Sequence, residues 1–263
     1  MTQSTNNENA HRLIGIYSRR LSEDLDQKVV EWKESGGERL IAENIRRRAF
    51  YRLNCALLEA RALKDCGRAR QSLLDVVSIT LRILDLAREG VPYECDDLEA
   101  GIYAAMMLGS MDEAKALAVS ILSKPRTEGP AAFYAGFSRL SASFVIDDRA
   151  LFASERRWVD ENQARETTYW WHTAHDVYHD LMHSVIERDL GRFNELMAKR
   201  EHLFAARPKD KNFRDVDLRF GGSAEDNSLV IDYMGAAIAK VGIRRGMNVD
   251  YSSDSVPVGL LRD

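Results

Sequence analysis

The sequence predicts an all-α protein of stacked antiparallel helix pairs, either a short irregular α-solenoid or a multi-helix bundle. Apolar residues recur with the 3.6-residue period of an α-helix from Leu21 to about Ala206. No alternating apolar and polar run of strand length competes with that pattern. Corners of the form helix–glycine–helix also recur along the chain. We expect residues 1–263 to form one helical domain, with residues 1–10 disordered.

Ten helical segments follow from the periodicity. Asp96, Asp112 and Ser228 suit helix starts because their side chains can accept hydrogen bonds from the first free backbone N–H groups. Pro92 and Pro125 mark connections between segments. The expected ranges are 22–34, 38–64, 68–88, 96–108, 112–123, 130–145, 149–162, 167–189, 192–206 and 228–245.

Three glycines, Gly67, Gly109 and Gly191, each follow the end of a periodic segment, where a left-handed residue costs glycine no strain. They are separated by 42 and 82 residues, and half of 82 is 41. The intermediate corner would fall near residue 150, where Asp147-Asp148-Arg149 interrupts the helical pattern. A spacing near 41 residues therefore predicts a stack of helix pairs.

The last part of the chain changes character. Residues 207–227 read as a polar connection to a C-terminal helix that contains the small residues Gly235-Ala236-Ala237-Ile238-Ala239. Because small side chains allow a close helix approach, we expect this helix to dock in the interior. Residues 256–261 read as a tail that packs on the surface.

Charge and cysteine content restrict the class of protein. With 37 basic and 41 acidic residues the net charge is −4, so a nucleic-acid partner is not expected for the whole chain. Residues 39–70 carry a local charge of +6, read as a solvated helix face, with RNA or phosphate binding as the alternative. Cys55, Cys66 and Cys95 form no ligand or disulfide pattern, and no leader or long apolar span is seen. We expect a cytoplasmic protein without a membrane partner or a cofactor.

Four histidines fall within one predicted helix and on one side of it, opposite the apolar stripe. We interpret this side as a solvent-exposed or partner-facing surface. The alternative is a metal site, because two histidines four residues apart on a helix can share an ion, but no metal is predicted. The side carries His172, His175, His179 and His183 together with Asp176 and Asp180.

Arg165 precedes His172 by the spacing found in helical RNases of the HEPN superfamily, in which such a pair could activate a ribose hydroxyl and steady the phosphate. Composition alone yields about two such matches by chance. No phosphate-binding glycine loop, nucleophile elbow or dinucleotide fingerprint occurs. We therefore predict no catalytic residues and keep the HEPN-like RNase as the alternative function.

The C-terminal sequence resembles bacterial immunity proteins that protect against contact-delivered polymorphic toxins. The residues that carry the likeness are 228–239, the small-residue helix, and 254–261, the proline-containing tail. The chain is most similar to the family numbered forty-nine among immunity proteins and less similar to the PoNi antidotes of DNase toxins. The His-rich helix followed by residues 190–196 is similar in layout.

This resemblance implies a protein that binds a cognate toxin domain and blocks its active site or its access to substrate. A stack of helix pairs offers a broad rigid surface, and acidic side chains would steer a basic toxin toward it. The oligomeric state and the toxin's chemistry stay open. The expected contact residues are Asp96, Asp97, Glu99, Asp112 and Glu113 from an acidic corner, and Trp171, His175, Asp176 and His179 from the histidine helix.

Overall fold

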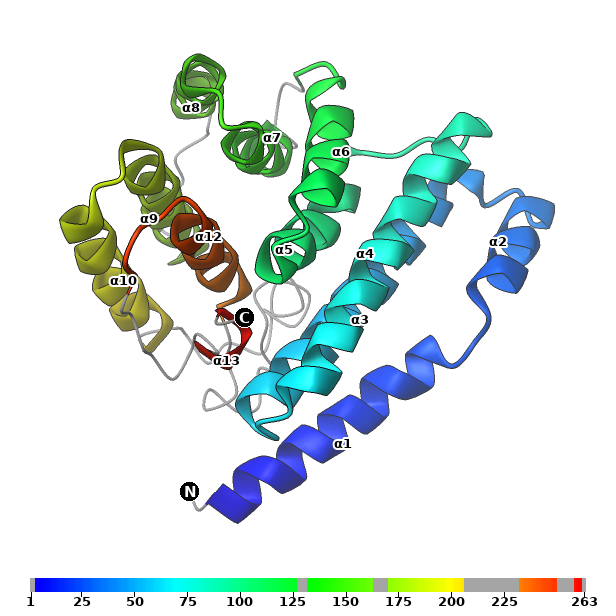
Figure 1. The fold of residues 1–263 in the computed structure, drawn as a ribbon. Helices are drawn as coiled ribbons and strands as arrows, with labels where there is room; N and C mark the ends of the chain where they lie inside the picture. Colours follow the sequence, from blue (N-terminus) through cyan, green and yellow to red (C-terminus); the bar gives the residue numbers. More distant parts are fainter. Residues whose placement is uncertain (1–2, 127–131, 163–169, 206–231, 250–257, 262–263) are drawn as a thin grey trace.

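The computed structural model describes residues 3–126, 132–162, 170–205, 232–249 and 258–261. All regular secondary structure in these ranges is helical, which confirms the predicted all-α fold (Figure 1). Within the same ranges, no helix is both long enough and apolar enough to cross a membrane.

The helices follow the predicted segments closely, and the range 149–162 agrees at both ends with α8. Two predicted helices, 38–64 and 96–108, each open with a short 3₁₀ turn, η1 and η2. The elements are α1 (Gln3–Leu21), α2 (Leu25–Glu34), η1 (Glu38–Leu40), α3 (Ile41–Arg61), α4 (Cys66–Arg88), η2 (Cys95–Leu98), α5 (Glu99–Leu108), α6 (Met111–Leu122), α7 (Ala132–Ile146), α8 (Arg149–Asn162), α9 (Trp170–Glu187), α10 (Leu190–Ala205), α12 (Tyr233–Arg244) and α13 (Val258–Leu261).

Helix α1 was not expected, and the structure places residues 3–10 in it rather than in a disordered segment. Ala10, Leu13 and Tyr17 recur at helical spacing and are buried against Cys55 and Leu58 of α3, in a small apolar cluster separate from the main core. Figure 1 shows α1 lying along the outer edge of the molecule, beside α3. Packing on α3 therefore stabilises a helix whose own sequence is polar at its start.

Consecutive helices pair as α3 with α4, α5 with α6, α7 with α8 and α9 with α10. Each pair turns at one left-handed residue, and these are Lys64, Gly109, Asp147 and Arg188. Their intervals of 45, 38 and 41 residues match the predicted spacing near 41. The predicted stack of helix pairs is thus present in the part of the chain that the structure describes.

The prediction for two of the corner glycines was wrong. Gly67 and Gly191 have ordinary negative φ and lie in the first turns of α4 and α10, three residues after the left-handed position. At those corners Asp65 and Asp189 accept hydrogen bonds from backbone N–H groups three residues later, at 3.0 and 2.9 Å. The aspartate cap therefore marks these corners. Just before the cap, the chain adopts a left-handed conformation at a residue with a side chain, which costs about 1–2 kcal/mol of conformational energy.

Helix α12 lies in the interior, as its small residues predicted, and all of its residues from Tyr233 to Gly242 are buried. It packs against α5 and α9. Asp232 caps it, accepting from the N–H of Gly235 at 2.8 Å and from the hydroxyl of Tyr178 at 2.6 Å, and it also pairs with Arg200. The expected connection 207–227 lies outside the described residues.

A close crossing fixes α5 on α4. Gly101 has no side chain to keep the helices apart, and a Cβ atom added there would lie 2.6 Å from the Cβ of Thr80. Thr80 and Gly101 are both buried. Because α5 is held so closely, the 3₁₀ turn η2 that precedes it is placed firmly beside α3.

Candidate functional site

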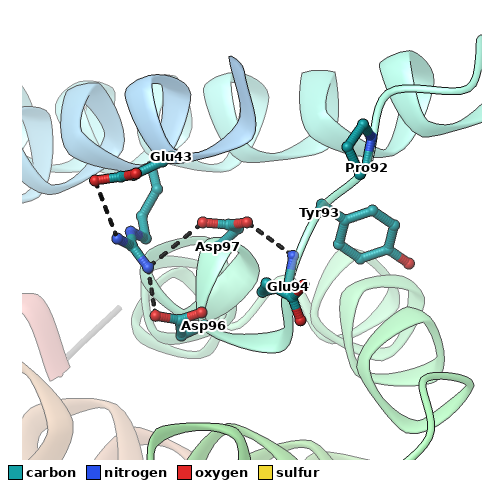
Figure 2. A pocket seen from close by; sticks show the side chains of 7 residues that line it. Glu43, Pro92, Tyr93, Glu94, Asp96 and Asp97 are labelled. Atoms are coloured by element: carbon teal, nitrogen blue, oxygen red, sulfur yellow. Dashed lines mark hydrogen bonds and ion pairs between the residues drawn. The ribbon is translucent and has the colours of Figure 1, made fainter. Parts of the chain in front are cut away.

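An open pocket of about 370 Å³ lies where η2 meets α3, and we call it the acidic pocket. Figure 2 shows carboxyl groups from two separate stretches of the chain converging on it. It is lined by Glu43, Arg46, Pro92, Tyr93, Glu94, Asp96 and Asp97.

Backbone hydrogen bonds hold one wall of the pocket in place. Two residues after the end of α4, Gly90 has a positive φ of 95°, which lets the N–H of Val91 bond the carbonyl of Leu86 at 3.0 Å. The chain then enters η2, where a carboxylate oxygen of Asp97 accepts from the N–H of Glu94 at 2.8 Å. This bond closes the start of the turn and points the Asp97 carboxyl group inward.

Arg46 is the cation at the centre of the carboxyl groups. Its guanidinium pairs with Asp96, lies 3.5 Å from Asp97 Oδ1 and lies 4.0 Å from Glu43 Oε1. Arg46 and Asp96 are largely shielded, with side chains 15% and 17% exposed. The pocket thus holds a pre-formed ion-pair network whose members come from α3 and η2.

The acidic pocket has an excess of negative charge. Four carboxyl groups and one guanidinium line it, which gives a formal charge of −3 when all are ionised, and three of the carboxyl groups lie within 4.0 Å of Arg46. Burial raises the pKa of Asp97 to about 6, although the Glu94 N–H and the charge of Arg46 act to lower it. The pocket is therefore most negative above pH 6 and loses charge below it.

An aromatic side chain borders the carboxyl groups. The Tyr93 hydroxyl donates to the carbonyl of Ser120 at 3.4 Å, and Lys124 Nζ lies 3.7 Å from the centre of its ring. In Figure 2 this hydroxyl points away from Asp96 and Asp97. The ring thus shields one side of the pocket and already accepts a cation on its face.

The structure separates the predicted acidic corner into two places. Asp96 and Asp97 line the acidic pocket, and Glu99 is the half-buried first residue of α5. Asp112 and Glu113 are exposed in the first turn of α6, beyond the far end of α5. Ten helical residues span about 15 Å, so the two groups do not form one cluster.

Sequence reasoning missed three charged residues of the pocket, Glu43, Arg46 and Glu94. The Glu94-x-x-Asp97 spacing is typical of a capped helix start and could have drawn attention to Glu94. No local signal brings Arg46 to Asp96, which lies 50 residues later, because that contact depends on how α3 and η2 pack.

Among the described side chains of the histidine helix, His179 departs from the prediction. His179 is 2% exposed rather than solvent-facing, because its ring stacks on Phe137 of α7, with centroids 5.5 Å apart. Burial first, and then the charge of Arg156, lower its pKa to about 3, so it is neutral. His183 is exposed and so is Asp176. A helix with neighbours on several sides buries more than the one stripe that a helical wheel shows.

Arg165 lies outside the described residues, as do the side chains of His172, His175 and Trp171. Within the described ranges, no three histidine, cysteine or acidic side chains gather as metal ligands would.

The buried cysteines are poor nucleophiles. Burial raises the pKa of Cys55 and of Cys95 to about 11, so both thiols stay protonated at neutral pH. The three cysteines are free.

Comparison of the chain with protein-family models, with curated proteins and with solved structures found no match.

Proposed function

We propose that this protein is an immunity protein, which binds a cognate bacterial toxin domain and occludes its active site or its access to substrate. The acidic pocket is the observation that carries the proposal. It combines a negative charge, an ion-pair network and an aromatic wall in a concave surface, which suits a lysine or arginine side chain of a partner protein.

The arrangement supports tight binding because little must be ordered when a partner arrives. The carboxyl groups of Asp96 and Asp97 are already held by Arg46 and by the N–H of Glu94. A preorganised surface loses less conformational entropy on association than a flexible one. An incoming cation would join this network and reduce its excess of carboxylates.

The other expected contact residues define where the interface would extend. Asp112, Glu113 and Asp176 are exposed and stay predicted contacts. His179 is withdrawn from this set because a buried ring cannot meet a partner without unpacking α7 from α9.

The test uses the full chain and the protein domain encoded beside its gene. We expect a one-to-one complex by calorimetry and protection of cells that express the toxin. The double variant Glu94→Gln/Asp96→Asn should weaken binding at least about tenfold, because two charge-assisted contacts are lost. The control Glu195→Gln changes an exposed carboxylate on α10 that pairs only locally, with Arg192, and should bind like the wild type.

A second arm varies pH. Protonation of Asp97 reduces the negative charge of the pocket, so affinity should fall as the pH is lowered from 7.5 to 5. Asp97→Asn should remove most of this dependence. The absence of a complex would contradict the proposal, and so would RNA cleavage by the purified protein that Arg165→Ala abolishes.

A further inference from the structure

A second pocket of about 310 Å³ lies where α1 ends and α2 begins, against α3 and α4, and we call it the α1–α4 pocket. Leu21 is the last residue of α1 and Leu25 the first of α2, and Ile79 of α4 completes an apolar wall. Figure 1 shows these four helices together at one side of the molecule. The polar lining consists of Ser18, Arg48 and Arg52.

Arg48 is buried without a carboxylate partner. The side chain is 9% exposed, and one of its terminal nitrogens donates to the carbonyl oxygens of Leu21, at 3.2 Å, and Glu23. Its Nε is buried and has no acceptor, and no ion pair joins Arg48 to a carboxylate within the described ranges. A guanidinium in this position keeps a full positive charge beside a cavity and one N–H group unsatisfied.

The two neighbouring carboxylates make their closest contacts with other groups, and their charges reach Arg48 only from a distance. Glu23 lies 3.7 Å from Lys28 Nζ, and Asp24 accepts from the N–H of Gln27 at the start of α2, at 2.8 Å. Burial lowers the pKa of Arg48, while the charges of Glu23 and Asp24 only partly oppose that effect. The positive charge of Arg48 is thus not matched by a contact of its own.

The second arginine of the pocket is already neutralised. Arg52 Nε donates to an oxygen of Asp75 at 2.9 Å, and the same carboxylate accepts from Gln71. Among the described residues, Arg48 is therefore the arginine of this pocket without a carboxylate in contact, and a single such guanidinium fits a monoanion better than a phosphate monoester with nearly two charges at pH 7. The apolar wall adds a preference for an anion with a hydrocarbon part.

We propose that the α1–α4 pocket binds a small organic carboxylate, with the carboxylate group at Arg48 and Ser18. The hydrocarbon part packs on Leu21, Leu25 and Ile79. This site is separate from the acidic pocket and does not depend on the function proposed above.

Calorimetry with the full chain tests the site, with sodium hexanoate as the probe. We expect one site with a dissociation constant below about 1 mM. Acetate, which lacks the hydrocarbon part, hexanol, which lacks the charge, and inorganic phosphate should each bind at least about tenfold more weakly.

Two variants locate the binding. Arg48→Met keeps the length of the side chain without its charge and should weaken hexanoate binding at least about tenfold, because a charge-assisted hydrogen bond is lost. Its matched control is Arg47→Met, on the same helix but exposed and paired with Glu43. Leu25→Ala leaves Arg48 in place and should weaken hexanoate binding without changing that of acetate.

A direct readout keeps the test independent of how Arg48→Met folds. In the wild-type protein, methyl NMR signals of Leu21, Leu25 and Ile79 should shift together as hexanoate is added. The proposal is overturned if hexanoate does not bind up to about 10 mM. It is also overturned if hexanol or phosphate binds equally well, if these methyl signals stay unchanged, or if a folded Arg48→Met binds like the wild type.

Discussion

The α7–α8 hairpin and the junction between α1 and α2 each bury an arginine, and they compensate its charge differently. In the hairpin, Arg139 forms two hydrogen bonds with Glu155, at 3.0 and 2.9 Å, and a third with the carbonyl of Lys124. At the junction, Arg48 relies on the carbonyl oxygens of Leu21 and Glu23. The first arginine is a satisfied part of the core, whereas the second lines the α1–α4 pocket without a carboxylate in contact.

A third buried arginine follows the first pattern. Arg200 is fully buried and pairs with Asp232, whose carboxylate also accepts from Tyr178 and caps α12. The presence of a carboxylate partner therefore distinguishes the buried arginines that join helices from Arg48, which lines the α1–α4 pocket. Glu155→Ala and Arg48→Met test this difference directly, and substitutions at His179 and Arg188 test the burial of a neutral ring and the backbone of a corner.

The largest effect is expected from Glu155→Ala. This change leaves Arg139 buried without its carboxylate and also removes a partner of Arg126, so the free energy of unfolding should fall by about 3–5 kcal/mol. Urea unfolding measures it. Glu161→Ala, on the exposed side of the same helix, is the control and should change stability by less than about 0.5 kcal/mol. A loss below about 1 kcal/mol for Glu155→Ala would show that the pair is not structural.

The second test concerns pH in the α7–α9 region. His179 has a pKa of about 3 when folded and an ordinary value near 6.5 when unfolded, so the unfolded chain binds more protons between these values. Stability should therefore fall on acidification, by about 1–2 kcal/mol from pH 6.5 to 5, and this loss should be absent in His179→Leu. Urea unfolding at both pH values measures the difference between the proteins.

That difference isolates His179 from other titrating groups. The raised pKa of Asp97 acts in the opposite direction, but it does so equally in the wild type and in the variant. For Glu155, burial would raise the pKa, yet Arg139 and Arg126 together lower it, so its contribution is lost only below its ordinary value of 4.5. His183→Leu changes an exposed histidine of α9 and should keep the wild-type pH dependence. A wild-type slope in His179→Leu would contradict the burial of a neutral ring.

The third test removes the unmatched charge. Arg48→Met leaves no carboxylate unpaired, so without a ligand its stability should lie within about 1 kcal/mol of the wild type. The small loss reflects the two carbonyl groups that lose a donor. Urea unfolding of Arg48→Met and of Glu155→Ala under the same conditions compares the two changes in the free energy of unfolding. A loss of about 3 kcal/mol or more would mean that Arg48 is as structural as Arg139.

The smallest effect concerns the backbone where α9 turns into α10. Arg188 adopts a left-handed conformation with φ of 58°, whereas the corresponding position between α5 and α6 is Gly109 with φ of 72°. Arg188→Gly should raise the free energy of unfolding by about 0.5–1 kcal/mol, because glycine adopts this conformation without strain. Gly109→Ala should lower it, since a Cβ there would also meet Arg244. Thermal unfolding of both variants measures the two signs, and a destabilised Arg188→Gly would contradict the strain argument.

Features that follow from the spacing of residues within a short stretch of chain could be predicted. Apolar periodicity located the helices, and the interruption at Asp147-Asp148 marked a corner that the structure contains. The glycine rule misplaced the corners at Gly67 and Gly191, because an aspartate cap defines those helix starts equally well. Helix α1 was missed because its apolar residues are few and depend on α3 for their burial.

The sequence alone determined the all-α class, the helix pairs with their spacing near 41 residues and the burial of the small-residue helix α12. Each of these follows from periodicity, capping or side-chain size within a short stretch of chain. Only the tertiary structure decided that Arg46 meets Asp96, that His179 is buried and that Arg48 lacks a carboxylate partner. Those outcomes depend on which faces of distant helices pack together, and that choice is settled by the whole core.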